Sequence, residues 1–298
     1  MKPARQVVDG VLLLNKPVGI TSNAALQKAK WLLNAKKAGH TGTLDPFADG
    51  LLPLCFGEAT KFSAYLLDAD KHYRAVQQLG VTTTTGDPEG EVLCRAEVHA
   101  SCADIAAVLP RFVGEIEQIP PMHSALKHQG RPLYEYARAG IEIDRPPRKV
   151  TIRSLGMIEC APPRVVLEVQ CSAGTYIRTL AQDIGATLGC GAHLTALTRL
   201  GSGGFTLEQA HTLAELEAIE PAQRHALLLP PDCLVAHLPA VQLDDAEAEA
   251  LRQGRSIAYA TTEPGLIRAY TASNTFIGLV NADAGQLVPR RLVATQQA

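Results

Sequence analysis

The chain has 298 residues, of which 46% are hydrophobic and 19% are charged, and its formal net charge is −2 at pH 7. This composition is that of a globular protein with a sizeable core, built as one large domain or as a large domain and a small one. No apolar run is long enough to cross a membrane and no charged-then-apolar signal opens the chain, so we expect a soluble, cytoplasmic protein.

The seven cysteines are odd in number and never follow the spacing C-x-x-C, which argues against a disulfide framework and against a zinc ribbon. Cys190 and His193 are the nearest approach to a pair of metal ligands. One pair cannot complete a four-ligand site, so we expect reduced thiols and no metal.

The charges are unevenly distributed along the chain. Basic residues outnumber acidic ones in residues 1–45, 120–205 and 251–298, and acidic residues dominate the segments between them. Folding could gather the basic segments on one face that binds nucleic acid, or the pattern could be ordinary solvated surface. The sequence leaves these two interpretations open.

The first predicted elements are a strand and a helix. An apolar, β-branched run predicts a strand over residues 7–14, closed by the turn Asn15–Gly19. Thr21 or Ser22 then caps a helix over residues 23–33, which has apolar residues at helical spacing and lysines on its wet face.

The stretch Gly39–Gly50 follows directly and holds His40 and Asp45 among three glycines and a proline. Such a composition specifies the local backbone tightly. Asp-Pro is common in turns, so these residues alone are compatible with a purely structural turn as well as with a mount for a reactive carboxylate.

The middle of the chain predicts short strands and helices in alternation. They are a buried segment over 51–54, a helical turn over 61–67, a half-exposed strand over 72–80, a helix from the cap Ser101 to 111, a short strand containing His123, Ser124 and Lys127, a helix over 132–139, and strands over 150–160 and 165–171. Alternation in the strand over 72–80 would place Tyr73, Ala75 and Gln77 on one face.

The next predicted helix begins at the cap Thr175 and carries Tyr176 and Arg178 in its first turn. Side chains there point back past the helix N-terminus, where backbone N–H groups favour a nearby anion. An ordinary surface arginine is the alternative interpretation of Arg178.

The C-terminal part predicts a helix over 207–219 and the close of the main domain at 227–231. An acidic helix over 244–251 and short apolar runs separated by glycines then predict a compact β-rich module of about sixty residues. No P-loop and no dinucleotide-binding fingerprint occurs, so we expect no nucleotide cofactor.

A carboxylate in a rigid loop, several tyrosines and an arginine suit a polar or aromatic substrate. An unpaired Asp45 would act as nucleophile or base, Arg178 would hold it ionised, and tyrosines would stack on a planar ring. Glycosidase-like and nucleobase chemistry fit this set equally well.

Five stretches then point to one family, in that family's order: residues 11–22, 39–52, 71–75, 118–127 and 171–178. They resemble the bacterial tRNA pseudouridine-55 synthases of the TruB family, and the likeness covers most of residues 7–205. The resemblance implies an α+β pseudouridine synthase fold, whose mixed, mainly antiparallel central sheet is flanked by helices. It places this catalytic domain at residues 1–236 and a small β-rich, PUA-like RNA-binding domain at residues 237–298.

The resemblance also implies the activity, which is isomerisation of uridine-55 in the T-loop of tRNA to pseudouridine. The nucleotide is flipped out, and an aspartate-dependent step breaks and re-forms the glycosidic bond without metal or organic cofactor. The implied partner is the T-arm stem-loop of tRNA, with no membrane and no obligatory protein partner, and we expect a monomer.

Three positions match the family's catalytic residues. Asp45 matches the catalytic aspartate, and Arg178 matches the arginine that pairs with it. Tyr176 matches the tyrosine that contacts the base and is proposed to assist proton removal at C5.

Further positions match residues that bind the substrate. Tyr73 matches the tyrosine that packs on the target base, and His40 matches the histidine that fills the space left by the flipped nucleotide. Leu197 matches a position that lines the substrate, as Tyr176 also does. Lys16 lies in the first motif, where we expect it to support the fold.

Three residues depart from the family's pattern. Phe47 and Asp49 stand where leucine and threonine are usual, and His123 stands where many members carry tyrosine. No catalytic group is lost, but Asp49 adds a carboxylate four residues after Asp45, and the sequence leaves its orientation open.

Two other functions remain as alternatives. One is an RNA-binding protein that assists tRNA folding and in which modification is secondary. The other is a guide-dependent synthase that needs protein and RNA partners, which the short tail without a long basic extension disfavours.

Overall fold

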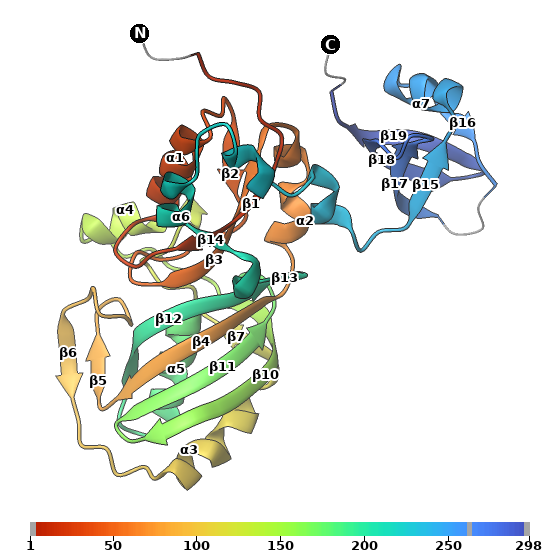
Figure 1. Cartoon of the computed structure of the whole chain (residues 1–298). Helices are drawn as coiled ribbons and strands as arrows, with labels where there is room; N and C mark the ends of the chain where they lie inside the picture. The colour runs from red at the N-terminus through yellow and green to blue at the C-terminus, as the bar shows by residue number, and fades with distance from the viewer. Residues whose placement is uncertain (1–3, 261–263, 295–298) are drawn as a thin grey trace.

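The structure is a computed structural model that describes residues 4–260 and 264–294. Its largest element is a ten-stranded sheet, which runs through both halves of the larger domain (Figure 1). The strands are β1 (Gly10–Lys16), β2 (Ala38–His40), β3 (Asp49–Phe56), β4 (Lys71–Leu79), β7 (Gly114–Gln118), β10 (Arg148–Ala161), β11 (Arg164–Cys171), β12 (Ala192–Ser202), β13 (Phe205–Thr206) and β14 (His211–Thr212).

The strand order is β14-β1-β3-β12-β4-β11-β10-β7, with β2 beside β3 and β13 beside β12. Only the pairs β1–β14 and β3–β12 are parallel within this sheet. The predicted mixed, mainly antiparallel sheet is therefore confirmed. The β3–β12 pair joins the two halves of the domain, because β12 also pairs with β4 along most of its length.

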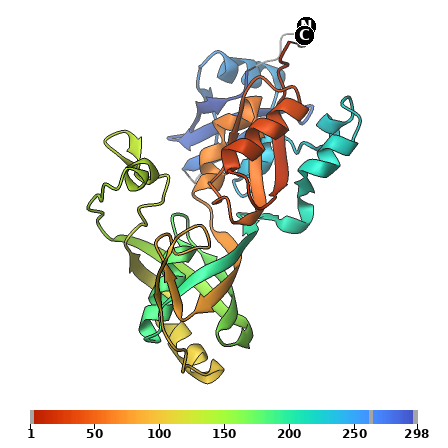
Figure 2. The same cartoon turned by 90° about the vertical axis from the view of Figure 1, so that its left-hand side faces the viewer.

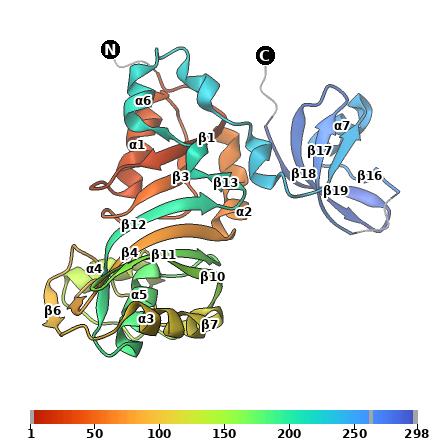
Figure 3. The same ribbon diagram turned by 60° about the horizontal axis from the view of Figure 1, so that its bottom comes forward.

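Helices cover both halves of the sheet. The α-helices of this domain are α1 (Ser22–Leu32), α2 (Ser63–Leu67), α3 (Cys102–Val108), α4 (Leu133–Arg138), α5 (Ile177–Thr187) and α6 (Leu213–Ala218), and the 3-10 helices are η1 (Gly57–Lys61), η2 (Leu109–Phe112), η3 (Leu207–Gln209), η4 (Arg224–Leu227) and η5 (Pro231–Val235). Figure 3 shows α1 and α6 beside β1, and α3 and α5 against the other half. Within the described ranges, no helix combines the length and the apolar character that a membrane span requires.

Two short hairpins project from this framework. One pairs β5 (Val81–Thr83) with β6 (Val92–Arg95), and the other pairs β8 (Lys127–His128) with β9 (Arg131–Pro132). The second hairpin and α4 form an insertion that stands away from the sheet (Figure 2).

Strand β1 shows why its sequence is apolar throughout. Leu12 and Leu14 pack in the main core, which includes α1 and α5, whereas Val11 and Leu13 pack in a second core with Phe62. A strand covered on both faces needs apolar residues at consecutive positions rather than at alternate ones.

The C-terminal domain is a five-stranded sheet with one helix. Its elements are β15 (Ala240–Leu243), α7 (Asp245–Arg252), β16 (Ile257–Ala258), β17 (Gly265–Thr271), β18 (Phe276–Asp283) and β19 (Gln286–Leu292). The domain docks through Phe276, whose ring lies 5.4 Å from that of Phe62, and through Leu279, which joins the second core. The predicted β-rich module is confirmed, while the boundary between residues 236 and 237 stays a prediction.

The helix expected over residues 207–219 is wrong. Thr206 and Thr212 each form a capping box, so the chain makes only η3 and then α6. Between them, His211 and Thr212 extend as β14 and pair with β1. Local capping and a sheet contact thus override the helical periodicity.

Two local expectations around the insertion and α5 are also wrong. The strand expected at His123, Ser124 and Lys127 is limited to Lys127–His128, because Ser124 N–H donates to the Met122 carbonyl in a tight bend. Thr175 does not cap α5, since its hydroxyl donates to the Ser172 carbonyl instead.

One disulfide contradicts the expectation of reduced thiols throughout. Cys102 and Cys160 are bonded, 58 residues apart in the chain, and link α3 to β10. Their side chains meet because α3 packs against β10, a contact that no local spacing reveals. Cys55, Cys94, Cys171, Cys190 and Cys233 are free.

Candidate active site

Asp45 lies in the loop that joins β2 to β3, and several backbone contacts hold this loop. Ser22 at the start of α1 accepts a hydrogen bond from Leu44 N–H at 2.8 Å and donates to the Leu44 carbonyl at 2.9 Å. Gly19 N–H donates to the Pro46 carbonyl at 2.7 Å. The loop is therefore pinned on both sides of Asp45, so the carboxylate sits on a restrained backbone.

Arg199 of β12 fastens the other side of the same loop. Its side chain is 1% exposed, and its Nε donates to the Leu51 carbonyl at 2.7 Å. Gly50 has a φ of +99°, and a Cβ built there would lie 2.4 Å from the Arg199 carbonyl oxygen. Only glycine allows this approach of β3 to β12, which brings the Asp45 loop against the second half of the domain.

Arg178 of α5 connects the two halves at the Asp45 carboxylate. Its Nε lies 3.0 Å from Asp45 Oδ2, and its Nη1 lies 3.2 Å from Asp87 Oδ2. The guanidinium also donates to the carbonyls of Thr85 at 3.0 Å and His123 at 2.7 Å. Because the Arg178 side chain is 4% exposed and uses four partners, its orientation is strongly determined.

The sharing of Arg178 changes the expected electrostatics of Asp45. Burial raises the pKa of Asp45, the nearby charge of Asp87 raises it further, and Arg178 lowers it, with a net shift upward. The expectation that Arg178 simply holds Asp45 ionised is incomplete, because one cation serves two carboxylates. A carboxylate whose pKa is raised in this way is a better base and nucleophile near neutral pH.

Tyr176 is the N-cap residue of α5, and Gln118 of β7 clasps its backbone. Gln118 Oε1 accepts from Tyr176 N–H at 3.0 Å, and Gln118 Nε2 donates to the Tyr176 carbonyl at 3.2 Å. Burial raises the pKa of the Tyr176 phenol, so the neutral form is favoured. Gln118 thus satisfies the N–H of the N-cap residue, although no side chain caps the N–H groups of the first turn of α5.

Tyr73 and Leu197 are placed by sheet register. Tyr73 of β4 lies opposite Arg199 of β12, and Leu197 lies opposite Ala75. Because side chains alternate along a strand, Leu197 and Arg199 share one face of β12. Burial raises the pKa of Tyr73, the charge of Arg199 lowers it, and the charge of Asp45 raises it. Tyr73 therefore lies close enough to Asp45 and Arg199 to feel both charges.

His40 ends β2, opposite Leu54 of β3. Its Nδ1 atom is buried and has no hydrogen-bond partner among the residues that the structure describes. Burial lowers the pKa of His40, and the charge of Arg199 lowers it further, so the imidazole is neutral at pH 7. In the described part of the chain, no hydrogen bond or ion pair joins His40 to Asp45.

Asp49 begins β3, and its Oδ1 atom is buried without a hydrogen-bond partner among the described residues. Lys16 is fully buried, and its Nζ donates to the carbonyls of Pro17 and Ile20 at 2.9 Å each. Burial lowers the pKa of Lys16 to about 8, and the negative charge of Asp49 partly opposes this shift. Asp87, and not Asp49, shares Arg178 with Asp45, so Asp87 is the second carboxylate beside the site.

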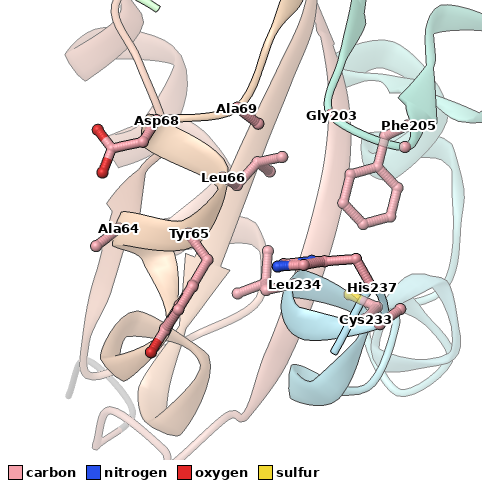
Figure 4. Close-up of a pocket in the computed structure, with 12 residues that line it drawn as sticks. Ala64, Tyr65, Leu66, Asp68, Ala69, Gly203, Phe205, Cys233, Leu234 and His237 are labelled. Carbon is pink, nitrogen blue, oxygen red and sulfur yellow. The ribbon is translucent and has the colours of Figure 1, made fainter. Parts of the chain in front are cut away.

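A hollow lies elsewhere, at the start of the connection to the C-terminal domain (Figure 4). It has a volume of about 640 Å³ and is lined by residues that include Tyr65, Phe205, Cys233 and His237. None of the predicted site residues lines it. Across the described residues, no group of three or more His, Cys, Asp or Glu side chains could hold a metal ion.

The structure thus brings Asp45, Tyr73, Tyr176 and Arg178 into one cluster, because the charge of Asp45 acts on the pKa of both tyrosines. Leu197 joins it through the sheet. Sequence reasoning missed three residues of this site, which are Asp87, Gln118 and Arg199. Gln118 opens the motif over residues 118–127, but neither the motif nor the local pattern gives its side chain a role.

Comparisons with known proteins agree with this geometry. Residues 30–177 match the profile of the TruB family pseudouridylate synthase N-terminal domain, residues 178–236 that of the tRNA pseudouridylate synthase B C-terminal domain, and residues 239–293 that of the pseudouridine synthase II TruB C-terminal domain. The tRNA pseudouridine synthase B of Thiobacillus denitrificans is 76% identical over the full length of both chains. That of Chromobacterium violaceum is 54% identical and covers 98% of this chain and 97% of its own.

Two solved structures are similar over most of the chain. The H/ACA RNP bound to a substrate RNA containing 2′-deoxyuridine has a TM-score of 0.72 and 26% identity, and the match covers 98% of this chain and 87% of that one. A Cbf5-Nop10-Gar1 complex has a TM-score of 0.69 and 30% identity, covering 93% and 79%.

Proposed function

Because the chain belongs to the TruB family of pseudouridylate synthases, we propose that it isomerises uridine-55 in the T-loop of tRNA to pseudouridine. The observation that carries the proposal is the cluster in which Arg178 bridges Asp45 and Asp87 between the two halves of the sheet. The substrate follows from the names of the relatives, which are tRNA pseudouridine synthases over the whole length of this chain.

In the proposed reaction the target nucleotide leaves its stack, at a cost of a few kcal/mol that aromatic contacts partly offset. Tyr73 packs on the flipped uracil, and Asp45 attacks the ring or the ribose, or stabilises charge as the bond breaks. The C1′–N1 bond breaks, the uracil turns, and C1′ bonds to C5. Tyr176 assists removal of the C5 proton, and N1 ends protonated, so the atoms balance without an external reactant.

The remaining roles support binding. His40 fills the space that the flipped nucleotide leaves, and Leu197 lines the bound base. Residues 1–236 form the catalytic domain, and residues 237–298 form a PUA-like domain that adds RNA contacts. The enzyme acts as a cytoplasmic monomer on the T-arm without a metal, an organic cofactor or an obligatory protein partner.

Tritium release from 5-tritiated uridine in a T-arm hairpin tests the proposal. Wild-type protein should release tritium, whereas Asp45→Asn should bind the hairpin and release none. Asp49→Asn is the matched control, because that carboxylate lies in the same loop region but acts on Lys16, and it should retain turnover. Full turnover by Asp45→Asn would exclude the mechanism.

A role in tRNA folding is the second candidate, and the C-terminal β-rich domain favours it because that domain contributes none of the catalytic cluster. Asp45→Asn protein should then still accelerate tRNA folding. Guide-dependent action is the third candidate. Turnover of a bare hairpin by purified protein would rule it out.

A further inference from the structure

Trp31 is the only tryptophan of the chain, and it is 63% exposed at the last turn of α1. Leu26, Ala29 and Leu32 bury the inner face of this helix, so Trp31 stands on the outer face. The fold gains little from a large aromatic ring in this position. Exposed tryptophans with a polar surround are typical of contact surfaces.

A hollow of about 650 Å³ lies beside this ring, a volume in the range of small-ligand sites. We call it the Trp31 hollow, and its lining includes Arg5, Trp31, Asn34, Pro221, Arg224 and His225. It combines an aromatic face with polar and cationic groups, which is the composition of a nucleotide site.

Two guanidinium groups of the Trp31 hollow keep their charge available. Arg5 Nη1 donates to the carbonyls of Lys30 at 2.9 Å and Ala35 at 3.5 Å. Arg224 donates one hydrogen bond from each of its three nitrogen atoms, to the carbonyls of Ile219 at 3.0 Å, Leu32 at 2.9 Å and Glu217 at 3.3 Å, which leaves two of its N–H groups free for a ligand. These carbonyls orient the two groups, but neither group pairs with a carboxylate within the described part of the chain. An oriented arginine without a carboxylate partner is suited to a phosphate.

We propose that the Trp31 hollow binds an unpaired nucleotide of the tRNA substrate outside the T-arm, with its base stacked on Trp31 and its phosphate held by Arg5 and Arg224. The inference rests on the proposed function, because it assigns a second contact of the same RNA. Lys28 is not part of this site: its Nζ lies 5.3 Å from the Trp31 ring and pairs with Glu217 at 2.5 Å, and it does not line the hollow.

The distance to the active site is suitable for one RNA molecule. Ser22 at the start of α1 is bonded to Leu44 of the catalytic loop, and Trp31 lies nine residues further on, which is roughly 14 Å along the helix. Nucleic-acid interfaces bury about 1,000 Å² or more of protein surface, a patch about 30 Å across. A patch of this width is large enough to include both Asp45 and the Trp31 hollow.

Intrinsic fluorescence provides the test, because all tryptophan emission comes from Trp31. Asp45→Asn protein, which does not consume substrate, is titrated with full-length tRNA and with the isolated T-arm hairpin, and labelled RNA reports occupancy by anisotropy. At equal occupancy, full-length tRNA should quench at least half of the emission and the hairpin less than a tenth.

Substitutions of Trp31 then measure how much this side chain contributes to the affinity for tRNA. In Trp31→Ala, the preference for full-length tRNA, expressed as the hairpin Kd divided by the tRNA Kd, should fall about 5- to 150-fold. Trp31→Phe keeps an aromatic face and should retain the preference within about threefold. Ile158→Ala, which removes another exposed apolar side chain on β10, is the matched control and should not change it.

Three outcomes would overturn the inference. These are unchanged emission at saturating tRNA, an unchanged preference in Trp31→Ala, or equal quenching by free adenosine monophosphate at the same micromolar concentration. Tritium release by wild-type protein separates this failure from failure of the proposed function. If the hairpin is converted, the function stands and only the second contact is lost.

Discussion

Gln118 binds both backbone polar groups of Tyr176. It accepts a hydrogen bond from the Tyr176 N–H at 3.0 Å and donates one to the Tyr176 carbonyl at 3.2 Å. Gln118 is 2% exposed, so water does not replace these bonds easily. Tyr176 immediately precedes α5, which carries Arg178. The clasp thus connects the end of β7 to two residues of the catalytic cluster.

Gln118→Met should lower kcat about tenfold with a change in KM below threefold. The substitution leaves the Tyr176 N–H without a partner, which costs about 1–3 kcal/mol, while the Tyr176 carbonyl keeps only its bond from Leu180 N–H at 3.0 Å. The backbone of Tyr176 is therefore held less firmly. Steady-state tritium release gives both constants. Gln77→Met is the matched control, because Gln77 is also buried and donates to a carbonyl of α5, that of Ala181 at 3.0 Å, but contacts neither Tyr176 nor Arg178. An equal loss of kcat in both variants would show a merely structural role.

Asp87→Asn should move the acid limb of the pH dependence of kcat to lower pH. Asp45 acts in its ionised form, so kcat falls as the pH decreases through the pKa of Asp45. Burial raises that pKa, and the charge of Asp87 raises it further. Removing the Asp87 charge therefore lowers it.

Single-turnover rates across the acid range measure this shift. Asp49→Asn is the comparison, because Asp49 acts on Lys16 and does not share Arg178 with Asp45. The same displacement in both variants would contradict the assignment of Asp87 as the second carboxylate.

Arg178→Met should reduce both activity and stability. Asp87, whose side chain is 3% exposed, would remain buried without its cation, and such a loss costs about 3–5 kcal/mol of unfolding free energy. Adding Asp87→Asn removes the unpaired charge, so the double variant should recover most of the stability but not the activity. Urea unfolding and tritium release measure the two effects. A double variant as unstable as Arg178→Met would refute this explanation.

Breaking the disulfide should lower stability without lowering kcat. Cys102 and Cys160 are 58 residues apart, and a cross-link over such a loop contributes about 2–4 kcal/mol by restricting the unfolded chain. Cys102→Ser should therefore unfold at lower urea. A reducing agent should destabilise the wild type by the same amount and leave the variant unchanged.

Cys94→Ser is the control for this measurement, because Cys94 is free and exposed. It should behave like the wild type with and without reductant. Loss of kcat on the hairpin in Cys102→Ser would show that the link between α3 and β10 also affects the site.

Helix α1 and the Asp45 loop show what local sequence determines. Thr21 caps the helix by accepting from Ala24 N–H, and the apolar spacing predicted residues 23–33 where the helix spans Ser22–Leu32. The glycines and the proline around Asp45 predicted a tight backbone for the same reason. These features depend on residues within a few positions of one another, so their physics is present in the sequence.

The electrostatics of the site depend on contacts that the sequence does not contain. Arg178 binds Thr85, which lies 93 residues earlier in the chain and two residues before Asp87. Gln118 lies 58 residues before Tyr176. The predicted helix over 207–219 failed in the same way, because His211 and Thr212 pair with β1. The motifs identified the family and predicted Asp45 as the reactive aspartate. Only the tertiary structure decided which carboxylate shares Arg178, because burial and charge interactions depend on distances that folding alone creates.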